Sequence, residues 1–72
     1  VMIELNVSTE ALESVVGILP CMREATVAPL HRGGGFAVKA AVPRDTLPTL
    51  IPEIKARGGS DIVVTGLNLI VA

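Results

Sequence analysis

The sequence predicts an α+β domain with the element order β-α-β-β-α-β. Three observations predict it: apolar residues alternate with polar or small ones in four segments, they recur at helical spacing in two others, and proline or glycine separates the segments. The chain has 72 residues, half of them hydrophobic, which suits a single small folded domain over residues 1–72.

The first half of the chain predicts a strand, a helix and a second strand. Residues 1–7 place apolar side chains at the odd positions, which is typical of a half-buried strand. Ser8 can cap the helix that follows, and Pro20 ends it. That helix would bury one apolar stripe, formed by Ala11, Leu12, Val15, Val16 and Leu19. Residues 25–30 form a short strand, in which Pro29 favours a sheet edge or a strand end.

The second half repeats the order strand, helix, strand. Three consecutive glycines in residues 31–35 predict a hairpin loop, and residues 36–42 alternate as a strand. Asp45 or Thr46 can cap the second helix. Its buried stripe would be Leu47, Leu50, Ile51 and Ile54. Residues 61–71 are rich in β-branched residues and predict the last strand.

Proline and glycine mark the ends of these elements. Pro48 is tolerated in the first helical turn, whereas Pro52 should bend the second helix or delay its regular start. Gly58 and Gly59 predict a left-handed cap after that helix. Gly66 predicts a bulge or a strand end.

This order is that of a ferredoxin-like β-α-β-β-α-β sandwich, with two helices on one face of a four-stranded antiparallel sheet. The more apolar phase of each strand should lie under the helices and the other phase should remain uncovered. This open face would comprise Met2, Glu4, Asn6, Thr26, Ala28, Leu30, Ala37, Lys39, Ala41, Val63 and Thr65. Its mixture of small, apolar and hydrogen-bonding groups suits a subunit contact or a small-ligand site built at one.

Composition excludes several classes of function. The net charge of −1 argues against nucleic acid and anionic membranes as partners. No apolar run approaches the roughly 18 residues of a membrane span, and no signal-peptide pattern is visible. Cys21 is the only cysteine and His31 the only histidine, so we expect no disulfide, no metal site and a cytoplasmic setting. An aliphatic core this small favours association with copies of itself or with other domains.

No constellation of residues predicts catalysis. Gly33–Gly35 leads into a strand and not a helix, so we interpret it as a turn and not as a phosphate loop. Cys21 and His31 lie on different predicted elements. Glu4 and Lys39 share a face and would form a cross-strand ion pair if their strands are adjacent. The remaining acidic residues considered, Glu10, Glu13 and Glu24, are explained by a solvated surface. We therefore expect no catalytic residues in this chain.

Three segments are more specific. They are Ala25-Thr26-Val27-Ala28-Pro29-Leu30, then Phe36 to Arg44, and then Gly58 to Thr65. In content and spacing they resemble the C-terminal regulatory domain of long-form ATP phosphoribosyltransferase, the first enzyme of histidine biosynthesis. The resemblance covers all 72 residues. It implies a ferredoxin-like domain that binds L-histidine as a feedback inhibitor between regulatory domains.

The resemblance also implies what the rest of such an enzyme does. Separate phosphoribosyltransferase domains would join ATP to phosphoribosyl pyrophosphate with magnesium, and the whole would change between dimers and hexamers. The partners of this chain would be L-histidine, its own copies and those catalytic domains.

Five positions correspond to effector contacts in the resembled family: Asn6, Met22, Thr26, Ala41 and Asp61. Asn6 is neutral where that family usually has an aspartate that holds the ligand ammonium. We hypothesise that Asp61 supplies the missing charge, since a charge-assisted hydrogen bond contributes roughly 1.5–3 kcal/mol. Cys21 and Gly35 also depart from the pattern, where glycine and tryptophan are usual. Two alternatives remain open: an assembly module that does not bind the effector, and a free-standing metabolite sensor of the same fold.

Overall fold

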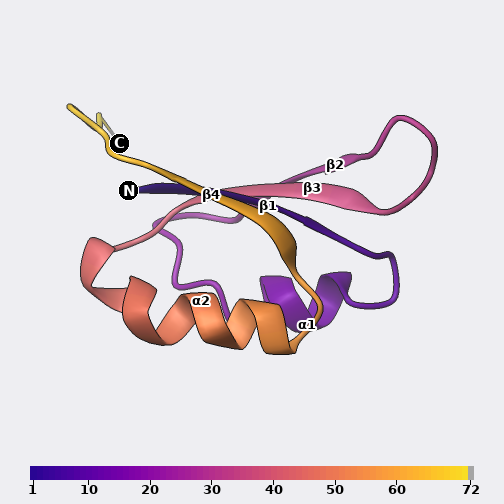
Figure 1. Ribbon diagram of the computed structural model, residues 1–72. Coiled ribbons are helices and arrows are strands. Elements are labelled where there is room, and N and C mark those ends of the chain that lie inside the picture. Colours follow the sequence, from indigo (N-terminus) through magenta and orange to yellow (C-terminus); the bar gives the residue numbers. More distant parts are fainter. Residues whose placement is uncertain (72) are drawn as a thin grey trace.

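The computed structural model describes residues 1–71 and has two layers, a four-stranded antiparallel sheet and two helices on one of its faces (Figure 1). The strand order is β2-β3-β1-β4, which is the ferredoxin-like arrangement. The elements are β1 (Met2–Val7), α1 (Leu12–Val16), β2 (Thr26–Pro29), β3 (Phe36–Ala41), the 3-10 turn η1 (Arg44–Thr46), α2 (Leu47–Ala56) and β4 (Ser60–Thr65). The predicted fold class is therefore confirmed.

The core lies between the two central strands and the helices, and its residues are those that alternation predicts. In β1 and along β3, alternate residues point under the helices while their neighbours face away. Pairing in register, such as Leu5 with Val38, brings the buried rows together. The buried cluster contains Ile3, Leu5, Val7, Val15, Leu19, Val38, Ala40, Val42, Leu50 and Ile54.

Helix α1 is much shorter than predicted. It covers Leu12–Val16, and Ser8 does not cap it: the Ser8 hydroxyl accepts the Ala11 N–H within the preceding turn, at 3.3 Å. The helix ends at Gly17, before Pro20. Leu19 is buried although it lies beyond the helix. The apolar stripe therefore predicted the burial of Leu19 correctly, but the prediction that Leu19 is part of the helix is wrong.

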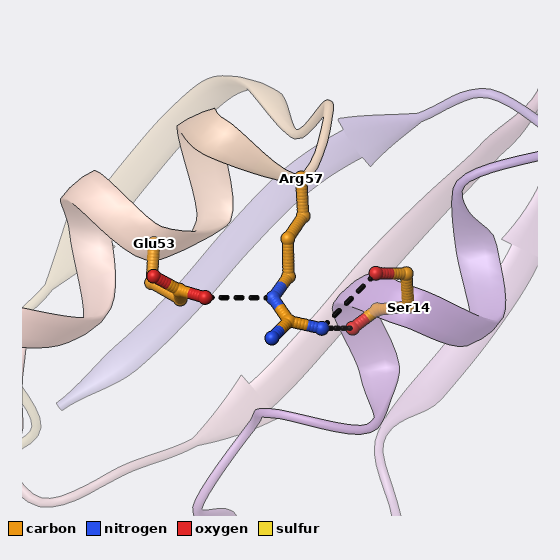
Figure 2. A network of polar contacts seen from close by, with 3 residues as sticks. All are labelled: Ser14, Glu53 and Arg57. Atoms are coloured by element: carbon orange, nitrogen blue, oxygen red, sulfur yellow. Dashed lines mark hydrogen bonds and ion pairs between the residues drawn. The ribbon is translucent and has the colours of Figure 1, made fainter.

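Arg57, which follows the last residue of α2, links that helix to α1 through hydrogen bonds (Figure 2). Arg57 Nε donates to Glu53 Oε1 at 2.8 Å, one turn back on the same side of α2. Its Nη1 donates to the hydroxyl of Ser14 at 3.1 Å and to the Ser14 carbonyl at 3.4 Å. The guanidinium thus gives one of the exposed carbonyls of this short helix a partner.

Helix α2 begins with Pro48 in its first turn and continues through Pro52. Thr46 occupies the cap position, but its hydroxyl donates backwards to the Pro43 carbonyl at 2.6 Å and caps no helical amide. Asp45 belongs to η1. Pro52 does not delay the start of the helix, since α2 begins five residues before it.

The predicted left-handed cap after α2 is confirmed. Gly58 has a φ of 102°. Its N–H donates to the Lys55 carbonyl at 3.2 Å, and the Gly59 N–H donates to the Ile54 carbonyl at 2.9 Å. This pair of bonds is a Schellman motif, which satisfies the last carbonyls of the helix and turns the chain into β4.

Strands β2 and β3 form the predicted hairpin, and Pro29 is the last residue of the edge strand β2. Gly35 is buried with a φ of 132°, and a Cβ there would collide with the Val7 carbonyl oxygen. A tryptophan is therefore excluded from this backbone at residue 35. Figure 1 shows that the hairpin projects beyond the helices, and Val27 is accordingly 38% exposed.

The last strand is shorter than residues 61–71. It ends at Thr65, so Gly66 marks a strand end and not a bulge, and the apolar residues that follow are exposed. A bulge lies instead near the start of the strand, because β4 has one more residue than β1 between the pairs Glu4–Val63 and Asn6–Ser60. None of the helices in residues 1–71 is long and apolar enough to cross a membrane.

Candidate functional site

The face of the sheet opposite the helices is uncovered, as alternation predicts. All the residues assigned to it are exposed or half-buried, and Val63 is 52% exposed. One row across the sheet consists of Thr26, Lys39, Glu4 and Val63. The next row contains Ala28, Ala37, Asn6 and Ser60. The face therefore alternates a row of long or branched side chains with a row that includes two alanines.

The bulge in β4 brings Asp61 to Asn6. Asp61 has a φ of 51°, the only positive φ among the described residues that are not glycine. Asn6 Nδ2 donates to Asp61 Oδ2 at 3.2 Å, and the Ser60 hydroxyl donates to the Asn6 carbonyl at 3.5 Å. Residues from the two ends of the chain thus place an amide and a carboxylate side by side.

These groups line a hollow of about 370 Å³ on the open face. Ala28 and Ala37 lie at the bottom of the hollow, and their side chains are single methyl groups that do not fill it. Polar groups surround it, contributed by Glu4, Asn6, Thr26, Lys39 and Asp61. Three of the five predicted site residues, Asn6, Thr26 and Asp61, are therefore brought together in one hollow.

The other two predicted residues line a neighbouring hollow of about 250 Å³. Met22 lies beside Ala41, since the Met22 N–H donates to the Ala41 carbonyl at 3.1 Å. Thr26 and Lys39 line both hollows and separate them. The five predicted positions are thus divided between two adjacent hollows on one face.

Lys39 is the residue of this face that sequence reasoning assigned to a different role. It lies directly opposite Glu4, which confirms that their strands are adjacent. The prediction that the two side chains form an ion pair is wrong, because the one ion pair in residues 1–71 joins Arg57 to Glu53. The signal that could have identified Lys39 was its strand phase, which it shares with Ala37 and Ala41 in the same strand.

The remaining candidate groups lie elsewhere. Cys21 is half-buried, and its thiol donates to the Leu19 carbonyl at 3.6 Å. His31 is exposed in the hairpin loop. Within residues 1–71 no three histidine, cysteine, aspartate or glutamate side chains come together as metal ligands. What the open face offers chemically is recognition of a small polar ligand, by carboxylate, amide, hydroxyl and ammonium groups.

Comparison with known proteins gives one family. The family model described as HisG, C-terminal domain, matches residues 1–69. Proteins named ATP phosphoribosyltransferase are similar across almost the whole chain. The relative from Pyrobaculum calidifontis is 39% identical over 99% of this chain, and the one from Pyrobaculum islandicum is 41% identical over the same share. The relative from Desulfosudis oleivorans is 37% identical over 96% of the chain. The chain spans about 25% of the length of the two Pyrobaculum proteins and 24% of the Desulfosudis one.

Proposed function

Because the chain belongs to the HisG C-terminal domain family, we propose that it is the regulatory domain of an ATP phosphoribosyltransferase and binds L-histidine as a feedback inhibitor. The observation that carries the proposal is the hollow on the open face. Asn6, Thr26 and Asp61 meet there, at positions where the sequence resemblance expects effector contacts. Two lines of reasoning, strand alternation and resemblance, support the same surface.

The chemistry of the hollow suits an amino acid. The Asp61 carboxylate can accept hydrogen bonds from an ammonium group, and the hydroxyl of Thr26 can donate to or accept from the ligand. The hollow of about 370 Å³ falls within the range of about 300–1,000 Å³ that is usual for ligand sites. Asp61 thus replaces, from the neighbouring strand, the charge that Asn6 lacks.

The second hollow, with Met22 and Ala41, would hold the less polar part of the ligand or of a neighbouring copy. A ligand on so open a face keeps one side in water unless a second chain covers it. We therefore place the site between copies of this domain. Histidine would then favour the assembly in which the site is complete, and so bias the catalytic domains, by linkage.

The activity itself belongs to other parts of the proposed enzyme. Catalytic domains, in the cytoplasm, would join ATP and phosphoribosyl pyrophosphate. In this proposal magnesium belongs to those domains, as the resemblance implies. Dimers and hexamers of the whole enzyme form part of the same proposal.

Calorimetric titration and sedimentation velocity of the 72-residue chain test the proposal, with L-histidine as ligand and D-histidine as control. We expect saturable binding of L-histidine, weaker binding of D-histidine, and a histidine-dependent increase in sedimenting mass. Association that ignores histidine would favour the assembly module without an effector. Binding with no change in mass would contradict the placement of the site between copies.

A further inference from the structure

The main hollow has its one cation, Lys39, on one side and the Asn6–Asp61 pair on another, with Glu4 beside Lys39 in the same row. Asn6 and Asp61 form one wall, where an amide N–H meets a carboxylate at 3.2 Å. Thr26 and Lys39 form another, because these two residues are direct partners of adjacent strands. The alanine methyl groups of residues 28 and 37 lie in the same row as Asn6, next to the row of Thr26 and Lys39.

The separation of the two walls follows from the register. Asn6 is paired with Ala37, and Lys39 is two residues further along the same strand. Asn6 and Lys39 are therefore diagonal neighbours, which in antiparallel sheets lie about 7–8 Å apart. The ammonium and carboxylate of an α-amino acid are attached to one carbon atom, and the flexible lysine side chain can reach a group held at the other wall.

The ammonium of Lys39 is available for a ligand. Glu4 is its partner in register, yet the two form no ion pair within residues 1–71, where Arg57 and Glu53 make the one recorded. Lys39 is exposed and borders both hollows. The charged groups that line the main hollow are Glu4, Lys39 and Asp61, so Lys39 is its one cation.

We propose that Lys39, together with the Thr26 hydroxyl, binds the carboxylate of the ligand while Asp61 binds its ammonium group. The hollow then takes an α-amino acid as a zwitterion. This inference rests on the proposed function and adds to it a residue that determines which ligands are accepted. Lys39 recognises the backbone part of the amino acid, so it discriminates against amines that lack a carboxylate.

Binding of two ligands to the wild-type chain and to Lys39→Gln tests this assignment. L-histidine has both charged groups, whereas histamine has the ammonium and imidazole but no carboxylate. We expect Lys39→Gln to weaken L-histidine binding about tenfold or more and to change histamine binding less than twofold. Lys39→Arg should restore most of the L-histidine affinity. Lys55→Gln is the matched control, because Lys55 is the other lysine and is exposed on α2, away from the open face.

The outcomes separate this inference from the proposed function. Equal losses for both ligands, or no loss for L-histidine, would overturn the role of Lys39 and leave histidine binding intact. If wild-type chain binds another proteinogenic amino acid in place of L-histidine, and Lys39→Gln weakens that binding, the proposed function is wrong and the carboxylate contact stands. Absence of binding for every amino acid tried would overturn both. Circular dichroism of each variant confirms that the exposed substitution leaves the fold unchanged.

Discussion

Asp61 combines a strained backbone with a well-placed carboxylate. A residue with a side chain pays about 1–2 kcal/mol in the left-handed region, less for aspartate and asparagine, whereas glycine adopts it freely. Here the strained residue faces the open hollow and accepts a hydrogen bond from Asn6. Strained backbone of this kind gathers at functional sites, which is why the conformation of Asp61 supports a binding role.

Substitutions of Asp61 separate stability from binding. Asp61→Asn should change the free energy of unfolding by less than about 0.5 kcal/mol, and Asp61→Gly should raise it by up to about 1 kcal/mol. Both should weaken L-histidine binding about ten- to hundredfold, since the charge-assisted bond is lost. Urea unfolding and calorimetric titration measure the two effects. The other aspartate, Asp45, lies in η1, so Asp45→Asn should bind normally. Unchanged affinity in Asp61→Asn would remove this residue from the site.

Gly35 is required for a different reason. Its φ of 132° and its approach to the Val7 carbonyl both exclude a Cβ atom. Gly35→Ala should therefore lower the free energy of unfolding by about 2 kcal/mol or more, measured by urea denaturation. Gly34→Ala is the control, because nothing lies within 4 Å of its added Cβ. Equal stability of the two variants would show that the hairpin can rearrange around Gly35.

At the scale of elements, periodicity predicted which residues are buried better than it predicted where helices end. The strands β1 and β3 were predictable because their buried residues alternate without interruption. The ends of α1 were not, because Leu19 is buried from a turn just as it would be from a helix. The end of β4 was missed because Leu69 is apolar yet 80% exposed, so apolar character alone did not indicate pairing.

The candidate site could be predicted from the sequence only in part. Alternation placed Asn6 and Thr26 on one face, but the bulge that brings Asp61 to Asn6 has no local sequence signal, because aspartate adopts a left-handed conformation in only a minority of cases, although it does so more often than most residues. Lys39 was missed because a cross-strand ion pair with Glu4 already explained it. Such a pair competes with hydration of both groups, and in this structure it is not formed.

Pro52 makes α2 less stable than it could be. It lies inside the helix and has no N–H to donate to the carbonyl of Pro48, one turn earlier. Pro52→Ala should raise the free energy of unfolding by about 1–2 kcal/mol, after allowing for the greater freedom of the unfolded chain. Pro48→Ala should give no such gain, because first-turn amides lack helical partners in any case. Urea denaturation compares the two; a loss of stability in Pro52→Ala would show that the ring packs usefully.

At the scale of the whole molecule, the chain has one thin core. The described residues measure 33 × 23 × 18 Å, and no aromatic side chain is among the fully buried ones. One face of the sheet remains exposed, with Val63 accessible to a partner. A domain of this size gains stability from anything that covers such a face, which connects the proposed assembly to folding itself.

The unfolding temperature should consequently depend on concentration. If copies associate through the open face, a tenfold increase in protein concentration should raise Tm by several degrees, since 1 kcal/mol shifts Tm by about 4–8 °C in domains of this size. L-histidine should raise it further. Differential scanning calorimetry measures both effects. A Tm that is independent of concentration and of histidine would mean that the domain is stable as a monomer and that its open face is unoccupied under these conditions.

The cap of α2 and the bulge of β4 follow each other directly in the chain, in residues 57–61. The hydrogen bond from Gly59 to the Ile54 carbonyl fixes the helix end two residues before the carboxylate of Asp61. Arg57, in the same short segment, holds α1 through Ser14. Residues that cap α2, contact α1 and line the hollow of the open face are therefore contiguous in the chain. This one short segment joins the helix layer to the ligand side of the sheet at one corner of the domain.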